Sequence, residues 1–184
     1  DDAHHFIMPS QIQEEIQKLL LLVLDFYKSL NFKPEFYFAT KPDKAMGDPK
    51  LWKKAEKDLE LALKNAKVKY GIKEKDGAFY GPKIDIHIKD SQKRDWQLAT
   101  IQLDFQIPEK LKLEYIDKDG QPKRPIIIHR AITGSLERFI GILAEHFQGA
   151  FPLWLSPVQT VIMPITDKQE IYAKKIVEEL KKNG

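Results

Sequence analysis

The feature that most constrains the fold is a change in hydrophobic period near residue 68. Upstream of it, apolar residues recur at helical spacing, whereas Ile84, Ile86 and Ile88 alternate strictly with polar residues, as in a strand with one buried face. We predict strands at roughly 84–89, 95–105, 111–116 and 124–129. Because the loops between these segments are short, neighbouring strands should pair antiparallel. The sequence therefore predicts one antiparallel sheet.

The rest of the chain is predicted to consist of helices and short strands. The helices cover about 10–30, 49–66, 134–147 and 167–182, and the short strands cover His5 to Met8, Phe36 to Phe38 and Val158 to Ile165. Ser10 with Gln13 matches a capping box for the first helix, and Asp48 before Pro49 is typical of the start of the second. The proline-rich segment from Phe151 to Pro157 is predicted to be a linker.

Length and composition narrow the class of protein. The 184 residues suffice for one domain and part of another, and a formal charge of +3 is too balanced to indicate nucleic acid by itself. The absence of cysteine excludes thiolate ligands within the chain and fits a reduced intracellular compartment. The longest apolar run, Leu19 to Leu24, is far shorter than the ~20 residues that span a bilayer, and no signal peptide precedes it. The chain begins without methionine and ends after a predicted helix, so we expect both ends to continue in a longer protein.

The predicted helix from 134 to 147 has an unusual polar side. Its expected buried side carries Leu136, Phe139, Ile140, Leu143 and Phe147, and its opposite side carries Gly134, Arg138, Gly141 and Glu145. An interior glycine costs about 1 kcal/mol relative to alanine, so the space cleared beside Arg138 requires a reason. One explanation is a planar ligand or phosphate chain along the glycines. The other is close backbone packing against a sheet, with Arg138 in a buried ion pair. The pattern favours neither.

Three segments carry a family resemblance. They are FYGPK (Phe79 to Lys83), WQLATIQLDF (Trp96 to Phe105) and IHRAITGSLERFIGIL (Ile128 to Leu143), in which Glu137 and Arg138 match the Glu-Arg pair of the third class II motif. In order and spacing they resemble threonyl-tRNA synthetases, a family of class II aminoacyl-tRNA synthetases. The resemblance implies an α+β fold with an antiparallel active-site sheet flanked by helices. Residues 1–155 would form the C-terminal part of the catalytic domain, and residues 156–184 a linker with the first βα unit of an α/β anticodon-binding domain.

The resemblance also implies an activity. Members of the family are threonine–tRNA ligases, which use ATP to convert threonine to threonyl-adenylate and transfer it to tRNA-Thr. We expect a cytoplasmic protein with no membrane partner, and a homodimer in the full-length family. The dimer-forming first motif, the arginine of the second motif and the editing domain are not found in this sequence. We therefore expect the isolated chain to be inactive. The alternatives are a non-catalytic module that binds nucleotide, amino acid or zinc, and a structural paralogue.

Site residues are carried over from the family by position. Arg138 and Lys83 are the expected catalytic residues, with Arg138 beside ATP and its Mg²⁺. The expected threonine- and ATP-binding residues are Asp2, Tyr80, Gln97, Gln102, Ser135 and Arg138. His4 and His129 match two ligands of a catalytic zinc, which in the family binds the amino group and hydroxyl of threonine. The third zinc ligand, a cysteine, is missing from this chain.

The residues alone leave several of these roles open. His4 and His129 end strands far apart in sequence, where a histidine more commonly bonds a backbone carbonyl than a metal. If they do share a metal, their imidazoles must lie close together. Asp2 could be an exposed terminal aspartate, and Tyr80 a turn aromatic that covers the core. The other histidines, His5, His87 and His146, are expected to be structural or solvent-facing.

The two glutamines pose a geometric problem. Gln97 and Gln102 have opposite parity along one strand, so a regular strand would direct them to opposite faces of the sheet. Either a β-bulge falls near Ala99 and Thr100, or one of the two glutamines lies outside the site.

Overall fold

A computed structural model describes residues 1–183 of the chain. These residues form two compact units, Asp1 to His146 and the chain from Phe147 onward, which are described separately. No helix among the described residues is both long and apolar enough to cross a membrane.

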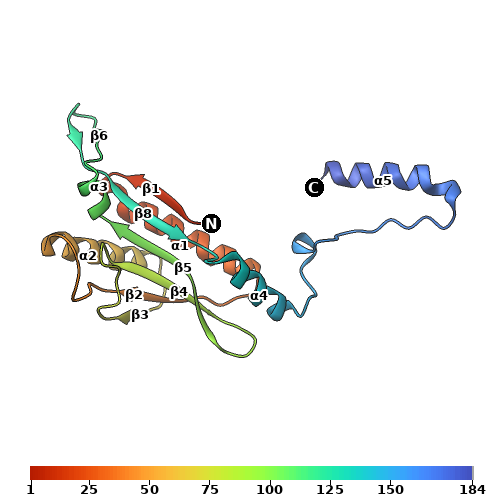
Figure 1. Cartoon of the computed structure of the whole chain (residues 1–184), viewed down its shortest axis with the longest axis horizontal. Helices are drawn as coiled ribbons and strands as arrows, with labels where there is room; N and C mark the ends of the chain where they lie inside the picture. The colour runs from red at the N-terminus through yellow and green to blue at the C-terminus, as the bar shows by residue number, and fades with distance from the viewer. Residues whose placement is uncertain (184) are drawn as a thin grey trace. The chain divides into compact units, whose positions relative to one another are not determined.

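The first unit is built on a six-stranded sheet (Figure 1). In spatial order its strands are β1 (Ala3–Ile7), β8 (Ile126–Ala131), β5 (Asp95–Asp104), β4 (Lys83–Lys89), β2 (Glu35–Ala39) and β3 (Tyr70–Lys73). β2 and β3 pair parallel, and the other neighbours pair antiparallel. The predicted antiparallel core of β4, β5 and β8 is confirmed.

The strand predicted at 111–116 is wrong. The chain leaves β5 into a short helix, α3 (Gln106–Lys110), and then forms a separate hairpin of β6 (Tyr115–Ile116) and β7 (Pro122–Lys123). The cause lies in Asp104, whose carboxylate accepts the backbone N–H groups of Gln106 and Ile107 and so starts the helix. The apolar residues that suggested a strand do not face the core, since Leu111 is 64% exposed.

Two helices cover one face of the sheet (Figure 1). They are α1 (Ile12–Ser29) and α2 (Pro49–Asn65), two amphipathic helices that pack on each other. Both helices were predicted. Ile84, Ile86 and Ile88 are fully buried on the covered face. Because all three isoleucines point toward the helices, the residues between them on β4 point to the opposite, open face.

The two helix starts differ in outcome. The Asp48 cap of α2 is confirmed, because its carboxylate accepts the N–H of Lys50 at 2.8 Å. The Ser10–Gln13 capping box is wrong. A 3₁₀ turn, η1 (Pro9–Gln11), precedes α1, and the Gln11 side chain accepts the N–H of Met8 at 2.9 Å. The capping glutamine therefore lies two residues earlier than predicted, because the 3₁₀ turn fills the first turn of the expected helix.

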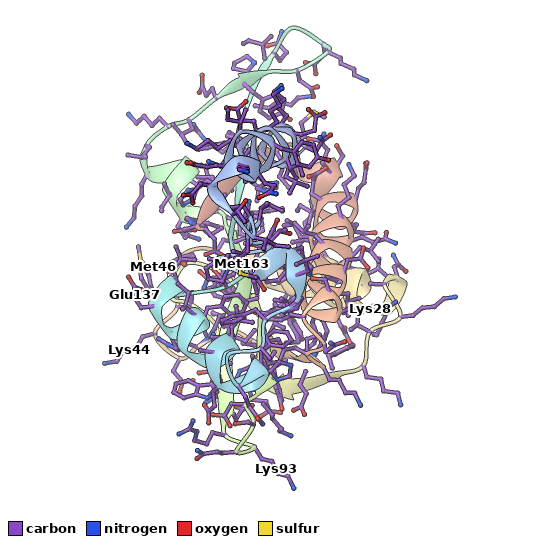
Figure 2. The ribbon with its side chains drawn as sticks, turned by 90° about the vertical axis from the view of Figure 1, so that its right-hand side faces the viewer. Lys28, Lys44, Met46, Lys93, Glu137 and Met163 are labelled. Atoms are coloured by element: carbon purple, nitrogen blue, oxygen red, sulfur yellow. The ribbon has the colours of Figure 1, made fainter. Side chains whose placement is uncertain are left out.

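The arginine-bearing helix, α4 (Leu136–Phe147), begins two residues later than predicted. Its buried residues are Phe139, Ile142 and Leu143, whereas Leu136 and Ile140 are 53% and 60% exposed. The predicted buried stripe is therefore partly wrong. The helix packs through a narrow side against the aromatic end of α1, where Phe139 stacks on Phe26 with ring centroids 5.8 Å apart. Glu137 lies on the side of α4 turned away from α1 (Figure 2).

A β-bulge interrupts the pairing of β4 with β5. Ile86 pairs with Ala99, but the next residue of β4, His87, pairs with Gln97, which leaves Leu98 as the extra residue. The bulge confirms the first of the two alternatives for the glutamines, one residue before the predicted position. Gln97 and Gln102 consequently share the open face of the sheet.

The second unit has little regular structure before its helix, α5 (Glu170–Lys182). Two 3₁₀ turns precede it, η2 (Leu153–Leu155) and η3 (Asp167–Gln169). The strand predicted from Val158 to Ile165 is not formed. A lone strand leaves its backbone groups without partners, and no other strand exists among the described residues of this unit to pair with it.

Candidate functional site

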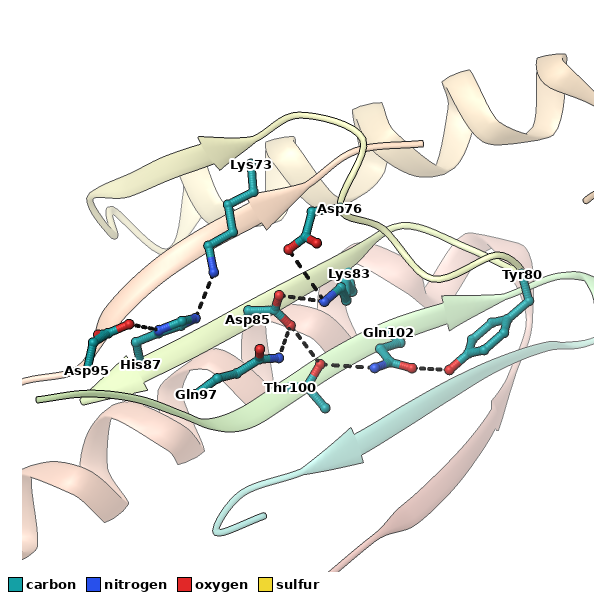
Figure 3. Close-up of polar contacts among 10 residues, drawn as sticks. All are labelled: Lys73, Asp76, Tyr80, Lys83, Asp85, His87, Asp95, Gln97, Thr100 and Gln102. Carbon is teal, nitrogen blue, oxygen red and sulfur yellow. Dashed lines mark hydrogen bonds and ion pairs between the residues drawn. The ribbon is translucent and has the colours of Figure 1, made fainter. Parts of the chain in front are cut away.

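The open face of the sheet is lined by polar side chains. They come from β4, β5 and β8 and include Lys83, Asp85, His87, Gln97, Thr100, Gln102 and His129. Figure 3 shows how most of them are joined by hydrogen bonds and ion pairs along the sheet. The alternation that buries the isoleucines against the helices places these groups on the other side.

A buried carboxylate lies at the middle of this face. Asp85 accepts a hydrogen bond from Lys83 Nζ at 2.7 Å and from Gln97 Nε2 at 2.7 Å (Figure 3). Thr100 Oγ1 donates to the same carboxylate at 3.3 Å, and Gln102 Nε2 donates to Thr100 at 3.2 Å. Three of the predicted site residues therefore belong to one hydrogen-bonded network, together with two residues that the prediction missed.

Tyr80 extends the network toward β8. Its hydroxyl donates to Gln102 Oε1, so it does more than cover the core. Burial raises the pKa of Tyr80, and the negative charges of Asp104 and Asp2 raise it further. The phenol therefore stays protonated at neutral pH and remains a hydrogen-bond donor.

A cavity of about 340 Å³ opens beside this tyrosine. It is lined by Asp1, Asp2, Tyr80, Thr100, Gln102, His129, Arg130, Ala131 and Gly134. Among the described residues, two buried side-chain polar atoms have no hydrogen-bond partner, and one of them, Arg130 Nε, belongs to a residue of this lining; the other is Thr133 Oγ1. Buried donors are rarely left unpaired, so the cavity is suited to a polar ligand. Four predicted site residues line it: Asp2, Tyr80, Gln102 and His129.

The predicted approach of His4 and His129 is confirmed. They are direct cross-strand partners on β1 and β8, with ring centroids 4.5 Å apart. His129 Nε2 lies 2.9 Å from Oδ2 of Asp104, a fully buried carboxylate. An ionised carboxylate only accepts, so in the neutral imidazole this contact would place the proton on Nε2 and leave the lone pair on Nδ1. A histidine held in this way by a carboxylate is the usual arrangement of a metal ligand.

The donor set for a metal is nevertheless partial. Among residues 1–183, no three side chains of the histidine, cysteine, aspartate or glutamate type cluster closely enough to hold a metal. The two neighbouring imidazoles could supply two of the nitrogen ligands of a zinc ion. A catalytic zinc also needs a third protein ligand, which these two histidines do not supply.

Arg138 lies at the other end of the site, over an aromatic ring. Its Cζ is 5.7 Å from the ring centroid of Trp96, a cation–π distance. The guanidinium is exposed and makes no hydrogen bond or ion pair with any described residue, so the buried ion pair considered above is wrong. An unpaired guanidinium resting on a fixed ring is available to a phosphate.

Trp96 is bonded to the β4–β5 turn, whose tip carries Lys93 (Figure 2). The indole Nε1 donates to Asp90 Oδ2 at 2.8 Å. Burial by itself raises the pKa of Asp90, but hydrogen bonds from Trp96 and Arg94 outweigh it and lower the pKa to about 2. The carboxylate therefore stays charged and keeps both partners throughout the neutral range.

His87 and Ser135 also have defined contacts. His87 is buried, with Nε2 2.9 Å from Lys73 Nζ and Nδ1 2.6 Å from Asp95 Oδ2, in line with a structural role (Figure 3). Ser135 immediately precedes α4, and its Oγ accepts the N–H of Arg138 at 3.4 Å. The structure leaves Ser135, Arg138 and His4 outside the lining of the cavity.

The two glycines beside Arg138 have different causes. Gly134 adopts φ +67°, and a Cβ there would lie 2.9 Å from the carbonyl oxygen of Leu98, so close packing against β5 explains it. Gly141 has open space around it, since a Cβ there would meet nothing within 4 Å. Only Gly141 therefore fits the idea of clearance for a ligand.

Substituting each glycine separates these causes. We expect Gly134→Ala to lower the free energy of unfolding by about 1–2 kcal/mol, because alanine is strained at positive φ. Gly141→Ala should raise it by roughly 0.5–1 kcal/mol, because alanine is the better helix former. Urea denaturation of both variants measures the difference. A destabilising effect of Gly141→Ala would contradict the open space found around this residue.

The residues missed from the sequence include Asp85, Thr100, Trp96 and Asp104, as well as Asp1 and Arg130 in the lining of the cavity. Asp85 and Asp104 could have been found by parity, because each alternates with buried apolar residues on a predicted strand. Thr100 shares the parity of Gln102 and Asp104, so the same rule places it on the open face, whereas its bond to Asp85 depends on the register between β4 and β5. No local signal indicates that Trp96 supports Arg138, since the contact joins a strand to a helix more than 40 residues later.

The largely antiparallel sheet, its open polar face and the unpaired arginine of α4 agree with the core of one class of protein, the class II aminoacyl-tRNA synthetases. Residues 1–147 match the family model described as tRNA synthetase class II core domain (G, H, P, S and T), so the chain belongs to this family.

Within that family the chain groups with the threonyl-tRNA synthetases. It is 52% identical over 184 residues to the threonine–tRNA ligase of Syntrophomonas wolfei, covering 100% of this chain and 29% of that protein. It is 50% identical over 185 residues to the threonine–tRNA ligase catalytic subunit of Saccharolobus islandicus, covering 99% of this chain and 34% of that protein. The chain thus spans about a third of the length of these relatives.

A solved structure supports the same grouping. The crystal structure of the RNA-binding domain of threonyl-tRNA synthetase from Cryptosporidium parvum Iowa II matches with a TM-score of 0.89 and 44% sequence identity. The match covers 100% of this chain and 46% of that chain.

Proposed function

We propose that this chain supplies part of the catalytic site of a threonine–tRNA ligase. The observation that carries the proposal is the convergence, within a class II core, of Asp2, Tyr80, Gln102 and His129 on one cavity. The substrates would be threonine, ATP with Mg²⁺, and tRNA-Thr. The working protein would be a cytoplasmic homodimer, as the family implies.

The reaction runs in two steps. The threonine carboxylate attacks the α-phosphorus of ATP and pyrophosphate leaves, which gives threonyl-adenylate. A hydroxyl of the terminal ribose of the tRNA then attacks the acyl carbon, and AMP leaves. Neither step needs a covalent bond to the protein, so positioning and neutralisation of charge supply most of the acceleration.

The cavity residues would orient threonine. Asp2, which immediately precedes β1, would accept from the substrate ammonium. Tyr80, whose O–H donates to Gln102, would offer its phenolic oxygen as an acceptor, and Gln102 would offer the second N–H of its amide. Zinc held by His4, His129 and a third ligand would supply a Lewis acid that binds the amino group and hydroxyl of threonine. Asp104 would fix the tautomer and ring orientation of His129 for this purpose.

The nucleotide would lie toward α4. Arg138, unpaired on Trp96, would neutralise phosphate charge, and Ser135 at the start of the helix would lie beside it. Lys83, held at 2.7 Å by Asp85, would add a second fixed cation on the open face. Gln97, on the same face, would contact the nucleotide through its amide.

A chimera tests the proposal. The corresponding segment of the Syntrophomonas wolfei relative is replaced by this chain, and threonine-dependent ATP–pyrophosphate exchange is measured. We expect exchange by the chimera and none by the isolated chain, because the chain has no cysteine and no second-motif arginine. Binding of zinc or of a threonyl-adenylate analogue by a chimera without turnover would favour a non-catalytic binding module instead. Robust exchange by the isolated chain would show the expected inactivity to be wrong.

A further inference from the structure

Asp85 is a fully buried carboxylate on the open face of the sheet. Its exposed fraction is 0%, and it does not line the cavity. A carboxylate removed from water is costly unless it is paired and fully hydrogen-bonded. Asp85 meets this condition entirely through side chains of its own face, so its partners determine what it can do.

Those partners are residues of the proposed site. Oδ2 accepts from Lys83 Nζ at 2.7 Å, and Oδ1 accepts from Gln97 Nε2 at 2.7 Å (Figure 3). The Lys83 side chain is only 14% exposed, so solvent screens this pair weakly. Lys83 comes from β4 and Gln97 from β5, so one carboxylate fixes two neighbouring strands' side chains relative to each other.

A third partner, Thr100, connects Asp85 to the residues that line the cavity. Thr100 Oγ1 donates to Oδ1 of Asp85 at 3.3 Å and accepts from Gln102 Nε2 at 3.2 Å. Gln102 in turn accepts from Tyr80, which lines the cavity. A continuous line of hydrogen bonds therefore runs from the buried carboxylate to the wall of the cavity.

We propose that Asp85 is a positioning residue that holds Lys83 and Gln97 for the nucleotide and, through Thr100, sets the amide orientation of Gln102. The role of these partners rests on the proposed function, whereas their dependence on Asp85 does not. Asp85 touches no substrate, because it is fully buried beneath the side chains that it holds.

To hold Lys83 and Gln97, Asp85 needs the negative charge of its carboxylate and both of its acceptor oxygens. Lys83 and Gln97 each direct a donor at Asp85, and a carboxylate can accept from both. Asparagine has the same shape but replaces one oxygen with an NH₂ group, which would face a donor with a donor. Asp85→Asn therefore releases at least one of the two side chains without creating a cavity.

The chain contains a matched control. Asp76 is the second carboxylate near Lys83, but its Oδ2 lies 3.9 Å from Nζ and its side chain is 56% exposed. Asp76→Asn removes the same charge beside the same lysine while leaving the contacts of Asp85 intact. Solvent screening makes such an exposed pair weak, so we expect little change.

The first measurement needs no ligand. In the 184-residue chain, the side-chain amide resonances of Gln97 are recorded by ¹⁵N NMR in wild type, Asp85→Asn and Asp76→Asn. We expect dispersed, exchange-protected Gln97 resonances in wild type and Asp76→Asn, and averaged resonances in Asp85→Asn. Unchanged Gln97 resonances in a folded Asp85→Asn chain overturn the proposal, whatever the chain binds.

A second variant covers the case in which Asp85→Asn does not fold. Thr100→Val keeps the shape of the side chain and removes its hydrogen bonds with Asp85 and Gln102, while the contacts of Asp85 with Lys83 and Gln97 stay in place. We expect the Gln102 amide to lose protection and the Gln97 amide to keep it. If both amides respond equally, or neither does, the proposed line of hydrogen bonds is wrong.

The last measurement connects the arrangement to function. Binding of ATP to the chimera is measured by calorimetry, with Asp85→Asn expected to weaken it roughly 10- to 100-fold, as misplacement of a contact by about 1 Å commonly does. The loss of ATP affinity caused by Asp85→Asn should be smaller when Lys83→Met or Gln97→Leu is already present, because Asp85 acts through these residues. If the losses from the single substitutions simply add in the double variants, Asp85 is not a positioning residue. A different outcome is that Asp85→Asn averages the Gln97 resonances but the unmutated chimera does not bind ATP. That outcome would refute the proposed function and leave the positioning role of Asp85 standing.

Discussion

Replacing Arg138 with alanine is expected to lower threonine-dependent ATP–pyrophosphate exchange by the chimera about 10²–10³-fold. The guanidinium has no hydrogen-bond or ion-pair partner among the described residues, and its one contact is with the ring of Trp96. Its removal should therefore change the stability of the fold little. Under the proposed function, its removal takes away a preorganised charge beside the phosphates of ATP. Arg138→Lys should recover only part of the rate, because an ammonium lacks the planar fork that binds phosphate and stacks on a ring.

The control for this result is another arginine of the chain. Arg124 contacts Glu109 and the carbonyl oxygen of Leu113, and it does not line the cavity. Arg124→Ala removes the same side chain and should leave the exchange rate within about twofold, as expected for a surface substitution away from the site. Equal losses from the two alanine variants would place Arg138 outside the chemistry.

The second large effect is expected at His129. In the chimera, His129→Ala should remove bound zinc, measured by elemental analysis, because one of the imidazole ligands is lost. Rejection of valine should fall with it. A site built to bind a substrate hydroxyl rejects the analogue without it by about 10⁴–10⁵, whereas shape alone separates the two poorly. Asp104→Asn should weaken zinc binding by about 10–100-fold, since it removes the carboxylate that orients His129.

His5 provides the comparison for this prediction. It neighbours His4 on β1 but points to the other face, where Nδ1 lies 3.7 Å from Glu15 of α1. His5→Ala should therefore retain zinc and the discrimination against valine. Zinc retained at full stoichiometry in His129→Ala would mean that the close pair of histidines serves the fold and not a metal.

Much of the fold was predictable because it depends on local periodicity. The isoleucines of β4 fix its buried face, and Asp48 with Pro49 fixes the start of α2. The predicted strands that do not form lie where another factor outweighs the hydrophobic period of the sequence. Asp104 turns the chain into α3, so an apolar alternation near residue 113 becomes a surface hairpin. The strand from Val158 to Ile165 fails for the opposite reason, because its apolar pattern has no partner strand among the described residues.

The site was predictable only in part. The positions of His4 and His129 came from the family resemblance, and their contact required the antiparallel pairing of β1 with β8. The sequence posed the problem of Gln97 and Gln102 correctly but could not place the bulge that resolves it. The residues that support the site were not predicted from the sequence. Asp85 and Trp96 act through partners that only the tertiary structure brings together.

The bulge at Leu98 has a consequence for how the length of β5 can vary. Deleting Leu98 would leave Gln97 opposite His87, so the amide would still face the open side of the sheet. A bulge, however, adds right-handed twist to a hairpin, and this hairpin carries Trp96 to Arg138 and Arg94 to Glu145, 2.9 Å away. A shortened β5 would run straighter and carry Trp96 away from the arginine. The presence of one extra residue in β5 thus sets the angle between the pair of Trp96 with Arg138 and the residues that line the cavity.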